Sequence, residues 1–303
     1  MKRSGTKVML RLIGLVKPLT GWMILAILMG LAGHLCASGI TVLGGYAVLE
    51  LLQVRVGIGL AAVFAGVSIF AVLRGLLRYG EQSCNHYIAF KLLALLRDQV
   101  FSALRRLCPA KLEGRDRGDL IAVITSDIEL LEVFYAHTIS PIAIAILFSL
   151  ISSLYISSFH PLLIPLLISK MSGADGMHFR TKSGELSSFV LDSLRGLDQT
   201  IQYGAGESRQ EQMKEKSNAL SLDEARMKRV AGRNLAMTNT IILLFDLMML
   251  CSCALLYQSG EIGFAGVLLP TLTLMSSFGP VVALANLGST LQNTFAAGNR
   301  VLD

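Results

Sequence analysis

The stretch Gly118–Pro141 reads GDLIAVITSDIELLEVFYAHTISP and lies between two long apolar helical runs. Its opening Gly-Asp pair supplies a turn and a helix cap for a short apolar segment, Leu120–Ile124. Ser126 and Glu129 then have the spacing of a capping box, which predicts a helix that restarts there and enters the apolar stretch beyond. A helix that stops, exposes a short apolar segment and restarts is typical of a docking feature, and we call the segment Leu120–Ile124 the apolar knuckle.

The composition indicates a membrane protein. Of the 303 residues, 53% are hydrophobic and only 16% are charged, whereas soluble domains are about a quarter charged. The mean hydropathy is +0.59. The first long apolar run exceeds the length of a signal peptide and lacks its cleavage pattern. Runs of membrane-spanning length occur at Leu19–Leu49, Val56–Leu73, Thr138–Phe159, Leu235–Tyr257 and Ile262–Leu291.

The positive charge follows the membrane topology. Of the 27 Lys and Arg residues, only Arg55 falls in a predicted outer loop, and the others lie in the N-terminal arm, in 74–117, in 170–233 or at Arg300. This positive-inside pattern predicts cytoplasmic termini and two large cytoplasmic loops, in a bacterial cytoplasmic membrane. It accounts for the net charge of +6 without nucleic-acid binding.

The five cysteines form no CxxC pair, so the sequence predicts neither a disulfide framework nor a metal site.

The predicted fold is an all-α membrane protein with six transmembrane helices and long cytoplasmic extensions. The second helix meets no proline before Pro109, and about 50 residues at ~1.5 Å each exceed the ~30 Å hydrocarbon core more than twofold. We expect an elbow helix over 1–17 and long helices over 18–49, 56–107, 127–158, 160–202, 207–257 and 262–298.

Three local features refine this topology. An apolar stripe on the second helix predicts packing of its cytoplasmic part against other helices. Pro141 predicts a kink in the third helix. The fourth crossing, near 160–170, is too short for a span, which favours the interpretation that residues are missing there. The stripe comprises Ala89, Leu93, Leu96, Val100, Leu104 and Leu107.

Six spans, an elbow and two cytoplasmic hairpins resemble the transmembrane domain of an ABC exporter. GDLIAVITSDIE at 118–129 is similar to the first coupling-helix region of that family, and LDSLRGLDQTIQYGAGESR at 191–209 resembles the second. FGPVVALANLGSTLQNTFAAGNRVLD at 278–303 is similar to the sixth helix before the nucleotide-binding domain. RYGEQSCNHYIAF at 78–90 and SPIAIA at 140–145 resemble the half-transporters of the CydC type, which assemble cytochrome bd and are associated with thiol or haem export.

The resemblance implies a permease portion that works with partners. These are a nucleotide-binding domain, a second identical or different half-transporter, and the lipid bilayer. ATP and Mg would bind to the nucleotide-binding domain, which is absent from this chain and either belongs to the same protein or is a separate subunit. The sequence has no GxxxxGK[ST] loop, so we expect no ATP hydrolysis by this region alone. Coupling to the ATPase is expected near 118–127 and 203–209, through Asp119, Leu120, Ile121, Ile124, Tyr203 and Gly204.

Three polar residues within the apolar runs are candidates for the translocation pathway. Asp246 lies mid-span, where a carboxylate by default faces a bundle interior or a water-filled cavity. Asn239 lies near the inner end of the same span, and the alternative is a structural hydrogen bond between Asp246 and Asn239 or Thr240. His34 is the third candidate, with a packing or hydrogen-bonding role as its alternative.

His86 matches a position that the CydC-type resemblance implicates in haem contact, and neutral imidazole is a common haem ligand. The alternative is an ordinary interfacial histidine. The sequence implies no other cofactor in this chain. The expected function is export of a thiol or haem-related cargo. The other functions considered are a multidrug or lipid exporter, a membrane scaffold or regulatory subunit, and a secondary transporter that uses Asp246. The long cytoplasmic arms argue against the secondary transporter, which has no need of them.

Overall fold

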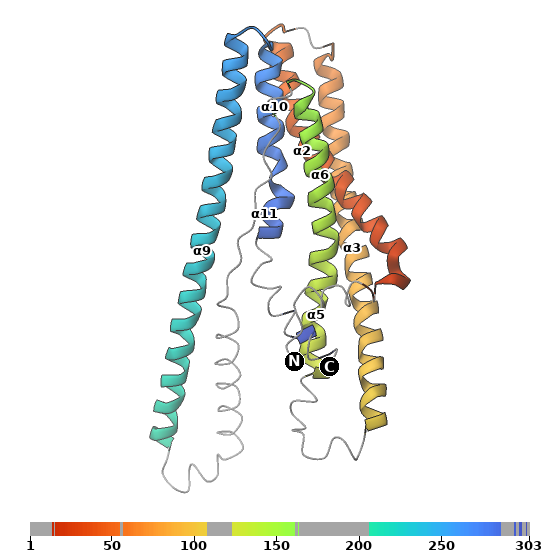
Figure 1. The fold of residues 1–303 in the computed structure, drawn as a ribbon, viewed down its shortest axis with the longest axis vertical. Coiled ribbons are helices and arrows are strands. Elements are labelled where there is room, and N and C mark those ends of the chain that lie inside the picture. The colour runs from red at the N-terminus through yellow and green to blue at the C-terminus, as the bar shows by residue number, and fades with distance from the viewer. Residues whose placement is uncertain are drawn as a thin grey trace.

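The computed structural model describes residues 16–54, 57–107, 123–160 and 206–285, together with residues 14, 163, 294, 297, 298 and 301. The described elements are all helices, in agreement with the all-α class (Figure 1). The described part of the chain contains five helical stretches that are long and apolar enough to cross a membrane, some of them made of more than one element. The predicted fourth crossing and most of the elbow helix lie outside the described residues.

The first two long helices form a tightly packed pair. After a short 3-10 turn, η1 (Lys17–Leu19), helix α2 runs over Thr20–Leu51 and α3 over Leu60–Leu107. Glycines on α2 allow this close approach, because small residues let helix backbones pack closely. A Cβ atom at Gly39 would lie 2.6 Å from the Phe70 ring on α3.

The third long helix is irregular at two places. It consists of η2 (Val123–Asp127), α5 (Ile128–Phe134), η3 (Tyr135–Ile139) and α6 (Ser140–Ser157), of which η2 and η3 are π-helical. The predicted helix start at Ser126 is wrong, because Ser126 already lies inside the helical turn η2 and Asp127 after it has helical dihedral angles. The wider turn of η3 ends at Ile139, two residues before Pro141. Pro141 lies in the first turn of α6, and the sequence predicted a kink at this residue.

The last part of the chain contains the longest helix, α9 (Gly206–Gln258), followed by α10 (Phe264–Ser277) and α11 (Gly279–Ala285). The single helix predicted over 262–298 is therefore interrupted at Phe278. Pro280 explains the interruption, since proline has no N–H to donate to the Ser276 carbonyl one turn earlier.

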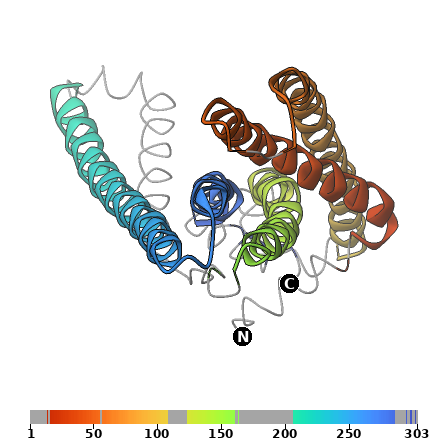
Figure 2. The same ribbon diagram turned by 90° about the horizontal axis from the view of Figure 1, so that it is seen from above.

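Two helices, α3 and α9, extend well past α10 and α11. The 48 residues of α3 and the 53 residues of α9 correspond to about 72 Å and 80 Å at ~1.5 Å per residue. Figure 1 shows both continuing past the lower end of α11, and Figure 2 shows α10 lying between α9 and the α2–α3 pair. In the described part of the chain, each rod is more than twice as long as the ~30 Å hydrocarbon layer is thick.

A buried core joins the inner ends of the helices to the cytoplasmic arm. Met23 of α2, Leu92 of α3 and Phe134 of α5 all belong to it. The predicted stripe on α3 is confirmed at Ala89, Leu93 and Leu96, which are buried, and Val100 packs against the same core. This cluster fixes α3 against α5 where both leave the membrane.

An ion pair lies at the edge of this core and should contribute little to the free energy of unfolding. Arg97 Nη2 lies 3.2 Å from Glu129 Oε1, and the two side chains are 46% and 63% exposed. We expect Arg97→Ala to change the free energy of unfolding by less than about 1 kcal/mol, because exposed ion pairs are screened by solvent. Chemical denaturation of the purified protein measures this, with Leu93→Ala on the same helix as the contrasting variant, expected to cost about 2–5 kcal/mol. A larger loss for Arg97→Ala would show that the pair holds the two helices together.

Candidate functional site

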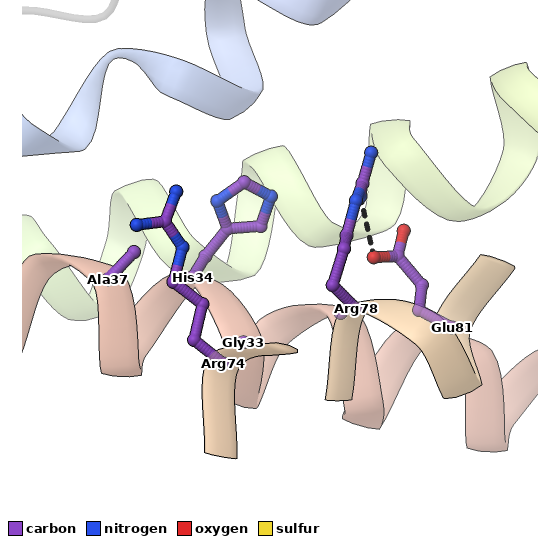
Figure 3. Close-up of a pocket in the computed structure, with 7 residues that line it drawn as sticks. Gly33, His34, Ala37, Arg74, Arg78 and Glu81 are labelled. Carbon is purple, nitrogen blue, oxygen red and sulfur yellow. Dashed lines mark hydrogen bonds and ion pairs between the residues drawn. The ribbon is translucent and has the colours of Figure 1, made fainter. Parts of the chain in front are cut away.

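The candidate site is a cavity of 240 Å³ between α2 and α3. His34 from α2 and Arg74, Arg78 and Glu81 from α3 line it, and Figure 3 shows these side chains rising from the two helices into the same space. The His34 ring also packs against Phe148 of α6, with 5.7 Å between ring centroids. The site therefore lies where three helices meet.

Besides His34, three small residues of α2 line this cavity on the side facing α3. Gly30, Gly33 and Ala37 present little more than backbone to it, at the three- and four-residue spacing of one helix face. A side chain at Gly30 would meet Ile144 and would lie 2.9 Å from the carboxyl carbon of Glu81. The sequence thus keeps room for polar side chains between tightly packed helices.

The cavity contains both signs of charge. Arg78 Nη1 donates to Glu81 Oε2 at 2.7 Å, and the Glu81 side chain is almost fully buried while that of Arg78 is more than half exposed. Arg74 forms no ion pair with the described residues. Two guanidinium groups and one carboxylate leave a net positive charge, to which His34 adds a hydrogen-bonding imidazole.

The other predicted pathway residues lie elsewhere in the chain. Asp246 and Asn239 are on α9, which packs against α10 rather than against α2 or α3. One carboxylate oxygen of Asp246, Oδ1, is buried without a hydrogen-bond partner among the described residues, and Asn239 is exposed. The Thr240 hydroxyl donates instead to the Ala236 carbonyl, at 2.9 Å. The single chain does not bring Asp246 and His34 together.

His86 belongs to a second polar cluster, further along α3. Its Nδ1 lies 3.5 Å from Glu132 Oε1, which is long for a hydrogen bond. Its ring stacks on Phe90 at 5.8 Å and meets the edge of His137 at 5.6 Å between centroids. The cluster joins α3 to the third helix, and no group of three or more metal-ligating side chains occurs in the residues that the structure covers.

The sequence did not predict the partners in either cluster. Arg74, Arg78 and Glu81 sit on one α3 face, but only the placement of α2 makes them neighbours of His34. His137 is separated from His86 by fifty residues, so no local spacing signals their contact. The one available signal for the cavity was a charge directly after an apolar run, at Arg74.

Most of the predicted coupling residues lie outside the described part of the chain, namely Asp119, Leu120, Ile121, Tyr203 and Gly204. Ile124 is described, and it is half-buried in the π-helical start of the third helix.

These features define an integral membrane protein whose helices cross the bilayer and continue as long arms. Residues 23–171 match the family model of the ABC transporter transmembrane region. The whole chain is 40% identical over 316 aligned positions to a probable ABC transporter ATP-binding/permease protein of Haemophilus influenzae, and spans 57% of its length. The aligned positions outnumber the 303 residues, so that relative contains residues without a counterpart here.

Two further relatives are described as the glutathione/L-cysteine transport system ATP-binding/permease protein CydC. The protein from Escherichia coli K12 is 30% identical over 130 residues, which is 40% of this chain and 22% of the relative. The one from Haemophilus influenzae is 33% identical over 82 residues, or 27% of this chain and 14% of the relative. With the helical fold, these similarities identify the chain as the transmembrane region of an ABC exporter, related to ATP-binding/permease proteins.

Proposed function

We propose that this region forms the translocation pathway of an ATP-driven exporter and transmits motion from ATPase domains to that pathway. The length of α3 and α9 is the observation that carries this proposal. A helix that continues about 40 Å beyond the hydrocarbon layer acts as a rigid lever, so displacement of its cytoplasmic end tilts its membrane part. A membrane scaffold has no need of such levers.

The partners follow from the same proposal. Both termini would be cytoplasmic, with ATP and Mg bound by a nucleotide-binding domain beside the arms. The Thr294 hydroxyl donates to the Leu130 carbonyl at 3.3 Å, which ties the C-terminal segment to α5 and supports a shared movement. A second half-transporter would cover faces that the single chain leaves open, because most side chains in the cytoplasmic half of α9 are exposed.

For the cargo we propose a small thiol, such as cysteine or glutathione. The two CydC relatives are described as glutathione/L-cysteine transport proteins, and we propose the same class of cargo for this chain. The mixed charges around His34 support a polar, zwitterionic cargo more than an apolar drug or lipid, since an apolar cargo would leave the Arg74 guanidinium without an anionic partner.

Uptake by inverted membrane vesicles tests the proposal. Vesicles that contain the complete transporter with its ATPase domain should accumulate L-cysteine or glutathione in the presence of ATP. They should not do so with a non-hydrolysable ATP analogue, and vesicles without the transporter are the control. Accumulation of other compounds but no thiol would contradict the proposed cargo, and accumulation of nothing would favour the scaffold.

Haem contact at His86 is a separate proposal about this chain. Glu132 lies near Nδ1, so Nε2 would be the nitrogen that holds the haem iron, and the carboxylate would orient the ring. His137 lies close enough to contact the same group. When bound, haem supplies a redox-active iron with axial positions for nitrogen ligands.

A further inference from the structure

Arg74 carries a positive charge that no described residue neutralises. Its neighbour Arg78 is neutralised by Glu81, whereas Arg74 has no such partner in the described ranges. It lies fourteen residues, or about 21 Å along the helix, from Leu60 at the outer end of α3. A ~30 Å hydrocarbon layer that begins at Leu60 would include Arg74, although the charge pattern of the sequence had assigned it to the cytoplasmic side. A guanidinium group at that depth is costly unless it faces water or an anion.

The surroundings of Arg74 suit a small anion better than a large one. The cavity has a volume of 240 Å³, and two glycines and an alanine line it on the α2 side. These small residues leave room for a compact ligand beside the charged residues of α3. A guanidinium group binds a carboxylate through two parallel N–H donors. His34 lines the same cavity and supplies a further nitrogen for hydrogen bonding (Figure 3). Glu81, whose carboxylate already accepts a hydrogen bond from Arg78, is the acidic lining residue that an ammonium group would face.

We propose that this cavity binds the carboxylate of an amino-acid-like cargo, with Arg74 as its principal anchor and His34 as a second donor. The inference rests on the proposed function, because it takes the cavity as part of the translocation pathway. It goes further in assigning recognition to one functional group of the cargo, the carboxylate, rather than to the thiol. The competing role for Arg74 is a contact with a lipid phosphate at the inner leaflet.

L-cysteine and cysteamine form the discriminating pair of probes, because cysteamine keeps the thiol and the ammonium group but has no carboxylate. ATP-dependent uptake of each is measured in inverted vesicles that contain the complete transporter. For the wild-type protein we expect a KM for cysteamine about 10- to 100-fold above that for cysteine, the range for losing a hydrogen-bonded ionic contact. In Arg74→Gln the KM for cysteine should rise to that of cysteamine, whose own KM should barely change.

Two variants complete the test. Arg74→Lys keeps the charge but loses the bidentate geometry, so it should restore part of the preference for cysteine. Arg105→Gln removes an exposed arginine from the cytoplasmic arm of the same helix and should leave both KM values unchanged. The melting temperature of each variant verifies that the protein remains folded.

The outcomes separate the two proposals. If the wild-type transporter accumulates neither these two compounds nor glutathione, the proposed cargo fails. If it accumulates cysteine and Arg74→Gln either has no effect or slows both compounds equally, transport stands and the carboxylate site is overturned. An equal loss would indicate the lipid contact instead.

Discussion

Replacement of Phe134 by alanine should lower the free energy of unfolding by about 3–5 kcal/mol, the range for removing a large aromatic side chain from a core. Phe134 is completely buried, and its ring packs edge-to-face on Tyr135 with 5.4 Å between centroids. It lies in α5, before the membrane part of the third helix, so water-based estimates apply to it. The cavity left by the ring would have no flexible neighbour to fill it, because Ile128 and Leu131 are themselves fully buried.

The effect can be measured by denaturation of the purified transporter with a thiol-reactive dye as the reporter. Cys84 and Cys253 are buried and unpaired, so both become reactive only as the fold opens. Phe101→Ala is the matched control, because that phenylalanine is on the cytoplasmic arm of α3 and 59% exposed. Equal changes for the two variants would show that the core between α3 and α5 does not determine stability.

The length of α3 and one of its packing faces could be predicted from local patterns. The stripe at Ala89, Leu93 and Leu96 has helical spacing, and the burial of those residues is confirmed. The absence of proline before Pro109 predicted a helix much longer than the bilayer, and α3 is such a helix. Both inferences need only the period of the helix and its rise per residue, which are the same in every context.

Contacts between helices could not be predicted in this way. Pairing of His86 with His137, or of Arg97 with Glu129, depends on the rotation and register of two helices relative to one another. The same holds for the cavity, where Gly30 matters only because Glu81 and Ile144 lie opposite it. The residue pattern of one helix does not determine its rotation and register relative to a neighbouring helix.

The capping-box error shows how tertiary structure overrides a local pattern. Ser126 and Glu129 satisfy the required spacing, yet the chain is already helical at Val123. Asp127 and Ile128 are buried against the core there, so the polar segment continues as a π-helical turn instead of ending one helix and starting another. Packing of the next apolar residues therefore decides the backbone conformation more strongly than the capping side chains do.

Leu120→Asp should abolish coupling between the ATPase and transport. The sequence places Leu120 in the apolar knuckle that precedes η2 (Val123–Asp127), and from there the chain continues through α5 into the membrane. If the knuckle docks into a groove on the ATPase domain, an aspartate there would bury an unpaired charge. We expect ATP-dependent uptake to fall by more than about 10-fold while ATP hydrolysis continues, since the ATPase domain itself is unaltered.

Leu120→Met is the matched control, because methionine retains the volume and apolar character of leucine and should keep both activities. Simultaneous loss of uptake and hydrolysis in Leu120→Asp would indicate misfolding or failed assembly, and retention of both would exclude docking by this residue. Loss of transport alone requires that force pass through the knuckle, because the pathway and the ATPase would both be intact. The long arms of α3 and α9 would then act as levers rather than as passive supports.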